Sequence, residues 1–280
     1  MTSIIKIFFF NTRWGELSLV SLYISVLSGV IIGLQFQPDT PLYSSTTLEL
    51  LIPYGAYFRS LHFYSSQLFF LLSIVHLIAV FEHSASYKVG TWAKYISSLA
   101  VVVLLLFSGY VLRGDTTGSS AGMIAENILL TIPLIGEMLN SLLFSIEDHG
   151  MTRVYLNHVI GLDVLWLLFI WRHLKNYRAT INSNILIISA TLISCLALSA
   201  PLEIAKPGTF YISGPWFFVG LQELLRFMPV MLAGVVLPSL FILALSCLRR
   251  ENRYFNQLLI FILIWLGSYS ILTIIGLLRS

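Results

Sequence analysis

The sequence predicts an all-α integral membrane protein with about seven transmembrane helices. Of its 280 residues, 57% are hydrophobic and only 10% are charged, whereas an average soluble domain has about 25% charged residues. The mean hydropathy is +0.87. A soluble protein of this length cannot hide so much apolar surface from water, and a disordered chain would need few apolar residues and many charges.

Seven apolar runs are each long enough to cross a bilayer as a helix, which takes about 20 residues. They cover residues 15–37, 59–83, 91–112, 153–174, 182–200, 229–248 and 256–277. The stretch 120–145 is broken by Pro133 and carries Glu137, so we expect one or two amphipathic helices on the membrane surface. The first 15 residues have too short an apolar run for a secretory signal and are expected to form an interfacial helix.

The predicted loop 201–228 is rich in Pro and Gly and divides the sequence into two parts. The N-terminal part, residues 1–180, has four spans, and the C-terminal part, residues 181–280, has three. Basic residues set the orientation: with the N-terminus inside, ten Lys and Arg lie on the inner side and six on the outer side. We therefore expect the N-terminus inside and the C-terminus outside. The net charge of +3 is too small to indicate nucleic-acid binding.

Four of the six histidines form two matched pairs on two predicted spans. His62 and His76 are 14 residues apart on the second span, and His158 and His173 are 15 apart on the fourth. At 100° per residue these spacings return the second imidazole to within about 40° or 60° of the first, after a rise of roughly 21–22 Å. Both spans cross in the same direction, so we expect His62 to face His158 and His76 to face His173.

Facing histidines on bundle helices are suited to axial ligation of a metal macrocycle. Two haems with bis-histidine ligation are the interpretation we favour, and without a CxxCH motif they would be bound non-covalently. Bis-histidine ligation leaves no open position on the iron, which suits electron transfer. Zinc is disfavoured because each layer supplies only two ligands. The alternatives are histidines that only pack and hydrogen-bond, or that relay protons in a transporter or structural membrane subunit.

Two arginines are expected at the outer haem. Haem propionates are anions and need cationic partners in a membrane. Arg59 lies one turn before His62, and Arg153 lies five residues before His158. The alternative is that both arginines extend to the membrane–water interface without binding a haem.

These residues resemble the cytochrome b/b6 family, the haem-bearing subunit of quinol:cytochrome c and quinol:plastocyanin oxidoreductases. The resemblance covers nearly the whole chain. The matching motifs are R-S-L-H at 59–62 with His76, T-R-V-Y-L-N-H at 152–158 with His173, G-Y-V-L at 109–112, I-P-L-I-G at 132–136, and P-L-E-I at 201–204. Gly15 and Gly29 resemble the family's paired first-helix glycines, which let a haem face approach the backbone. The C-terminal part resembles subunit IV of the b6-type complex, here joined to the b6-like part in one chain.

The sequence also departs from the family pattern. Gly214, Pro215, Trp216 and Phe217 align with the outer-loop motif P-E-W-Y, so Pro215 replaces the glutamate thought to take a proton from quinol. G-Y-V-L is followed by Arg113, Gly114 and Asp115 instead of P-W-G or P-W-D. Tyr95 stands where the family usually has a haem-facing glycine, and Ala79 where it usually has an arginine.

The resemblance implies a quinol-oxidising diheme cytochrome b, the subunit of a respiratory or photosynthetic complex in the bacterial inner membrane. Quinol would bind between Gly109 and Tyr110 on one side and the Gly214–Phe217 segment on the other. One electron would pass through the two haems to quinone near the inner face. The other would go to a c-type cytochrome or iron–sulfur subunit of a homodimeric complex.

Quinol oxidation releases protons, so a base is expected near the outer site. Asp115 is the first candidate, and Glu223 and Glu203 follow. The alternative is that Asp115 merely pairs with Arg113. The divergent Gly214–Phe217 motif also leaves open a non-bifurcating diheme electron conduit between the quinone pool and a multihaem c-type partner.

Overall fold

The computed structural model describes residues 9–146, 150–175, 177–203 and 212–279. Within these ranges the chain forms helices and short turns of helix, and no strand is present. The interfacial helix predicted for residues 1–15 lies largely outside the described residues. The prediction of an all-α membrane protein is confirmed.

In the described part of the chain, five helical segments are long and apolar enough to cross a membrane. They are α2 (Trp14–Gly33), α4 with the turn that follows it (Gly55–Ser86), α5 (Val89–Val111), α8 to α9 (Gly150–Leu174) and α13 (Phe255–Arg279). The other two predicted spans are shorter apolar helices, Asn182–Ala197, which contains α10 (Ile185–Ala197), and Leu232–Cys247, which contains α12 (Leu237–Cys247). At 1.5 Å per residue each reaches roughly 24 Å.

Local backbone features limit the length of both short helices: the first ends early, and the second has prolines near its start. At Leu198 the backbone becomes extended, with φ −104° and ψ 120°, so α10 stops at Ala197. The helix of the sixth predicted span, Leu232–Cys247, follows Pro229, and a second proline, Pro238, lies in the first turn of α12. A proline has no N–H to donate to the preceding turn, and the preceding turn, Leu232–Val236, is a π-helix.

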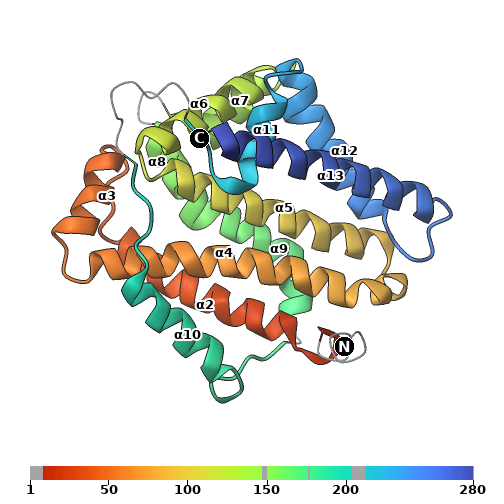
Figure 1. Ribbon diagram of the computed structural model, residues 1–280, viewed down its shortest axis with the longest axis horizontal. Helices are drawn as coiled ribbons and strands as arrows, with labels where there is room; N and C mark the ends of the chain where they lie inside the picture. The colour runs from red at the N-terminus through yellow and green to blue at the C-terminus, as the bar shows by residue number, and fades with distance from the viewer. Residues whose placement is uncertain (1–8, 147–149, 176, 204–211, 280) are drawn as a thin grey trace.

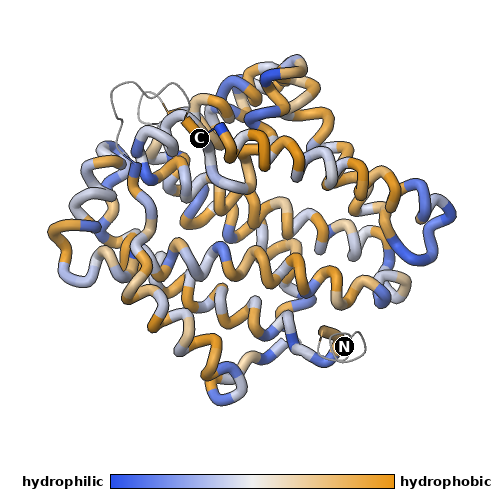
Figure 2. Tube along the Cα trace, in the orientation of Figure 1, coloured by the Kyte–Doolittle hydropathy of each residue, from blue (hydrophilic) through white to orange (hydrophobic). Residues whose placement is uncertain are grey.

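The predicted surface stretch 120–145 contains two helices, α6 (Thr116–Leu130) and α7 (Gly136–Leu143). The connection between them contains Pro133 and Leu134, whose φ of +68° lies in the left-handed region. Two further short helices, α3 (Pro41–Leu50) and α11 (Trp216–Leu224), lie in the loops before α4 and before α12. Hydrophilic residues gather at the connections, as at the loop between α12 and α13 (Figure 2).

The helices α2, α4, α5 and α9 (Leu162–Leu174) form the central bundle (Figure 1). Helix α2 packs closely on α4, and four of its seven buried residues are small: Ser18, Ser21, Ser25 and Ser28. Small side chains let helix backbones approach in a membrane. The C-terminal helices flank this bundle on two sides, since α10 packs on α4 and α2, whereas α12 packs on α5 and α13.

An extended segment, residues 198–203, crosses the end of the bundle, and we call it the strap. Its carbonyl groups at Ala200 and Pro201 accept hydrogen bonds from the Arg59 guanidinium. The Ala200 N–H donates to Ser60 Oγ at 2.9 Å, and the Glu203 N–H donates to Asp115 Oδ2 at 2.8 Å. The strap therefore connects the start of α4 to the junction between α5 and α6.

Asp115 holds this junction together. Its Oδ1 accepts from the Gly118 N–H at 2.8 Å and so caps the N-terminus of α6. Its Oδ2 accepts from Arg113 Nε at 3.0 Å as well as from the strap. The Asp115 side chain is fully buried, and that of Arg113 is 8% exposed.

We expect Asp115→Ala to lower the free energy of unfolding by about 3–5 kcal/mol, because it leaves a buried arginine without its carboxylate and removes a helix cap. The midpoint of thermal unfolding in detergent measures the loss. The control is Glu137→Ala on α7, an exposed carboxylate, for which we expect a change within about 0.5 kcal/mol. Equal midpoints for the two variants would contradict this role of Asp115.

Candidate functional site: two facing histidine pairs

The structure brings the four span histidines together as two facing pairs. His62 on α4 lies opposite His158, with ring centroids 6.1 Å apart and an interplanar angle of 84°. His76 on α4 lies opposite His173 on α9, with centroids 5.8 Å apart and an angle of 53°. Two imidazole nitrogens each bound at about 2 Å to one metal ion between them would place the ring centroids about 6 Å apart. Both pairs have the spacing that axial ligation of one iron requires.

A π-helical turn explains why His158 and His173, 15 positions apart, can face His62 and His76, which are only 14 positions apart. His158 lies in the turn Asn157–Gly161, between α8 (Gly150–Leu156) and α9. A π turn inserts one extra residue into a helix. The interval from His158 to His173 therefore follows the helix almost like an interval of 14, and both histidines reach the interior of the bundle.

Glycines face three of the four histidines, where any side chain would collide with the imidazole. A Cβ on Gly29 would lie 2.8 Å from His62 Cε1, and one on Gly109 would lie 2.9 Å from His158 Cε1. A Cβ on Gly15 would lie 3.0 Å from His76 Cε1. Among the described residues no glycine faces the fourth histidine, His173, and the Tyr95 ring lies 5.2 Å from it.

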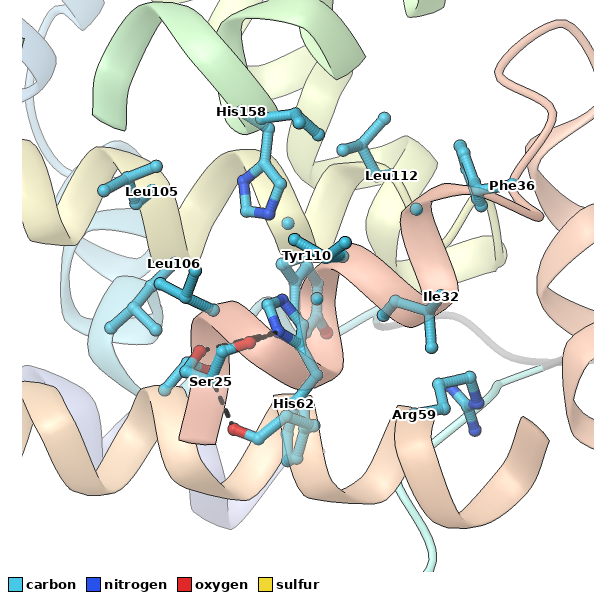
Figure 3. A pocket seen from close by; sticks show the side chains of 18 of the residues that line it. Ser25, Ile32, Phe36, Arg59, His62, Leu105, Leu106, Tyr110, Leu112 and His158 are labelled. Atoms are coloured by element: carbon cyan, nitrogen blue, oxygen red, sulfur yellow. Dashed lines mark hydrogen bonds between the residues drawn. The ribbon is translucent and has the colours of Figure 1, made fainter. Parts of the chain in front are cut away.

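His62 and His158 are called the outer pair, after the membrane face predicted for them from the sequence. A cavity of about 360 Å³ surrounds this pair, and the two side chains point into it from opposite sides (Figure 3). His62 Nδ1 lies 2.8 Å from the carbonyl oxygen of Ser25, and His158 Nδ1 lies 3.0 Å from Ser108 Oγ. These bonds fix the ring orientations and leave Nε2 of each imidazole for a ligand, as is usual for metal-binding histidines. The glycine cradle, the spacing and the donor atoms fit a haem.

His76 and His173, which we call the inner pair, lie beside the rings of Tyr95 and Tyr177. Tyr177 stacks on His173 with centroids 5.1 Å apart and an angle of 30°, and it lies 6.1 Å from His76. Burial raises the pKa of the Tyr177 hydroxyl, with a smaller contribution from the negative charge of Glu16. Sequence reasoning did not find Tyr177, although an aromatic residue four positions after a ligand was a readable signal.

Arg59 and Arg153 differ in their positions. Arg59 is buried and lines the outer cavity, and its Nε donates to Glu49 Oε2 at 2.8 Å. Arg153 is exposed and is not among the residues that line the cavity.

Two of the three carboxylates expected as bases have structural partners, and the third, Glu203, is exposed at the end of the strap. Asp115 forms the predicted ion pair with Arg113, and the Arg113 guanidinium also lies 4.4 Å from the centroid of the Tyr110 ring. Glu223 is fully buried and forms ion pairs with Arg279 at 3.4 Å and Arg226 at 3.9 Å. Its helix, α11, faces α13, since the Tyr269 hydroxyl of α13 donates to the Phe217 carbonyl at 2.6 Å.

The Gly214–Phe217 segment lies beside the outer cavity. Pro215 is the N-cap residue of α11. Trp216 Nε1 donates at 2.9 Å to the side chain of Gln67, which lines the cavity. The Gly214 N–H donates to Gln222 at 2.9 Å, which fixes the approach to the helix. None of these four residues carries an ionisable group.

One further ionisable residue lines the cavity and was missed by sequence reasoning. Asp163 lies on α9 within the span Gly150–Leu174. The signal was available, because an acidic residue inside a predicted membrane span is rare and usually functional. In the part of the chain that the structure describes, no group of three or more His, Cys, Asp or Glu residues could hold a metal ion.

We expect Gly29→Val to prevent the binding of a haem at the outer pair, because the added side chain occupies the position of the His62 imidazole. Absorption spectra of the reduced, purified protein measure the loss. The matched control is Gly90→Val on α5, where an added Cβ meets nothing within 4 Å. A Gly29→Val spectrum identical to that of the parent would show that this close approach has no role.

Comparison with known proteins agrees with this arrangement. A family model described as cytochrome b/b6/petB matches residues 1–181. A chain of a solved structure described as "Hyperthermophilic respiratory Complex III" superposes with a TM-score of 0.65 at 18% sequence identity, covering 95% of this chain and 86% of that one. The second match shows a shared fold, and the first covers more than half of the sequence. The chain is therefore a member of the cytochrome b/b6 family.

Proposed function

We propose that the chain is a diheme b-type cytochrome that oxidises quinol at the outer membrane face and carries electrons across the membrane. The observation that carries the proposal is the presence of two facing histidine pairs in one helix bundle. Each pair has a centroid distance near 6 Å. Membership of the family supports haem b as the group that these pairs would hold.

A haem between each pair would supply a one-electron carrier. The 14 residues between His62 and His76 correspond to a rise of roughly 21 Å along α4. Two carriers at this separation divide a layer of about 30 Å of low-dielectric hydrocarbon into short steps. Ser25 and Ser108 orient the outer ligands, and Gly29 and Gly109 give them room.

Quinol binding is proposed where the end of α5 meets the start of α11. Gly109 and Tyr110 line the outer cavity, and Trp216 reaches it through Gln67. The electron acceptor at this face would be a c-type cytochrome or an iron–sulfur subunit, and quinone would be reduced near the inner pair. We place the chain in a homodimeric bc-type complex of a bacterial inner membrane, with its N-terminus inside.

The contacts of two of the three candidate bases, Asp115 and Glu223, favour structural roles. Asp115 already accepts hydrogen bonds from Arg113, Thr117, Gly118 and Glu203. Glu223 faces α13 and pairs with Arg226 and Arg279. A carboxylate held in this way is poorly placed to accept a proton from a bound hydroxyl.

The lack of a carboxylate at Gly214–Phe217 favours the second candidate function. In a non-bifurcating conduit both electrons of quinol would leave by one route to a multihaem c-type partner. This function needs the same two histidine pairs but does not need the two electrons to be separated at the α11 N-terminus, where Pro215 stands instead of a carboxylate.

We expect the histidine variants to separate into two classes. His62→Ala and His158→Ala should remove one haem component, whereas His76→Ala and His173→Ala should remove the other. Low-temperature spectra and redox titration of each purified variant measure which component is lost. If His62→Ala and His76→Ala abolished the same component in a folded chain, the layered pairing would be wrong.

Arg59→Gln is expected to lower the midpoint potential of the outer haem. Ferric haem carries one more positive charge than ferrous haem, and removing an arginine while Glu49 stays favours the ferric form. Arg153→Gln, at an exposed position outside the cavity lining, is expected to leave that potential unchanged. Redox titration compares the two variants, and an unaltered potential in Arg59→Gln would remove this arginine from the haem site.

A further inference from the structure

Asp163 is a carboxylate near the middle of a membrane span. Its helical segment runs from Gly150 to Leu174, and its side chain is half-buried. It lines the same cavity as His62 and His158. An acidic group at this depth is costly unless it is paired or neutral.

The other buried carboxylates of the described chain have arginine partners. Glu16 pairs with Arg13 at 2.9 Å, Asp115 pairs with Arg113, and Glu223 lies 3.4 Å from Arg279. Asp163 differs from them, because no hydrogen bond or ion pair of its carboxylate is found among the described residues. Its charge is therefore not compensated by the protein around it.

The charged and titratable groups that face the cavity come from three of its walls. Helix α4 contributes Arg59 and His62, the end of α5 contributes Tyr110 and Arg113, and the helix of Asp163 itself contributes Tyr155 and His158. The α2 wall contributes apolar residues, glycines and Ser25.

Both arginines in this set are already neutralised by a carboxylate. Arg59 bonds to Glu49, and Arg113 bonds to Asp115. The two histidines are committed as ligands, and each has its Nδ1 in a hydrogen bond. The charge left for Asp163 to balance is the single positive charge that ferric iron gives to the porphyrin core of a haem bound between these histidines; the propionates at the haem edge carry separate negative charges.

We propose that Asp163 is the proton-binding site coupled to reduction of the outer haem. With ferric haem in the cavity, the added positive charge favours the ionised carboxylate. When one electron converts the ferric iron to ferrous, that charge disappears, and the Asp163 carboxylate takes up one proton from water. Oxidation of the haem releases the same electron and the same proton. This inference rests on the proposed function, since it requires a haem at the outer pair.

The test is a spectroelectrochemical titration of the purified two-haem protein over roughly pH 5 to 9. In the parent, the outer-haem potential should fall with rising pH by up to about 59 mV per pH unit, the one-electron equivalent of a tenfold change in proton concentration. Asp163→Asn should abolish this slope and raise the potential at alkaline pH, because the negative charge is gone. The potential of the inner haem should not change.

Two further variants sharpen the comparison. Asp163→Glu keeps the carboxyl group and should retain the pH slope. Glu137→Gln makes the same chemical change at an exposed position on α7 and should match the parent. If Asp163→Asn does not hold its haems, the pH range of the slope in Asp163→Glu decides the matter: moving the carboxyl group should shift this range from that of the parent, and an unshifted range would overturn the proposal.

A pH-independent outer-haem potential in the parent would overturn the proposal. So would a slope that persists in Asp163→Asn, since another group, such as a haem propionate, would then bind the proton. These outcomes are distinct from failure of the proposed function, which would appear as a purified chain that does not hold two haems.

Discussion

The close approach of helix backbones to two facing pairs of imidazoles is the constraint on which this structure depends. The rings in each pair must stay about 6 Å apart, so the helices behind them cannot carry side chains at the points of contact. Gly29 and Gly109 satisfy this requirement at the outer layer, and Gly15 does so for His76 at the inner layer. The buried serines of α2 are also small, and they allow the backbones of α2 and α4 to lie close together along their whole contact.

A second regularity is the local pairing of buried charge. Arg59, Arg113 and Glu223 each have an oppositely charged partner within the folded chain. Breaking a buried pair leaves a charge that the membrane cannot solvate, so these residues stabilise the loops and the strap that close the outer end of the bundle. Asp163 stands outside this pattern, and for that reason we propose that its charge depends on what occupies the cavity.

Much of the fold could be predicted from the sequence, because apolar runs and helical periodicity are local properties. The spacing of His62 and His76 sufficed to place two imidazoles on one helix face. The π turn at Asn157–Gly161 could not be predicted, since it depends on packing around His158. The same holds for the strap, whose contacts join residues about 140 positions apart. The partner of Arg59 was missed because Glu49 lies on α3, a helix absent from the predicted elements.

The most direct test of the account is the number of haems held by one chain. Acid–acetone extraction followed by a pyridine haemochrome assay on the purified protein measures non-covalent haem b per polypeptide. Two facing histidine pairs predict a count of about two, with all of the haem extractable. A count of one, or of none, in a correctly folded chain would contradict the central claim that each pair holds its own haem.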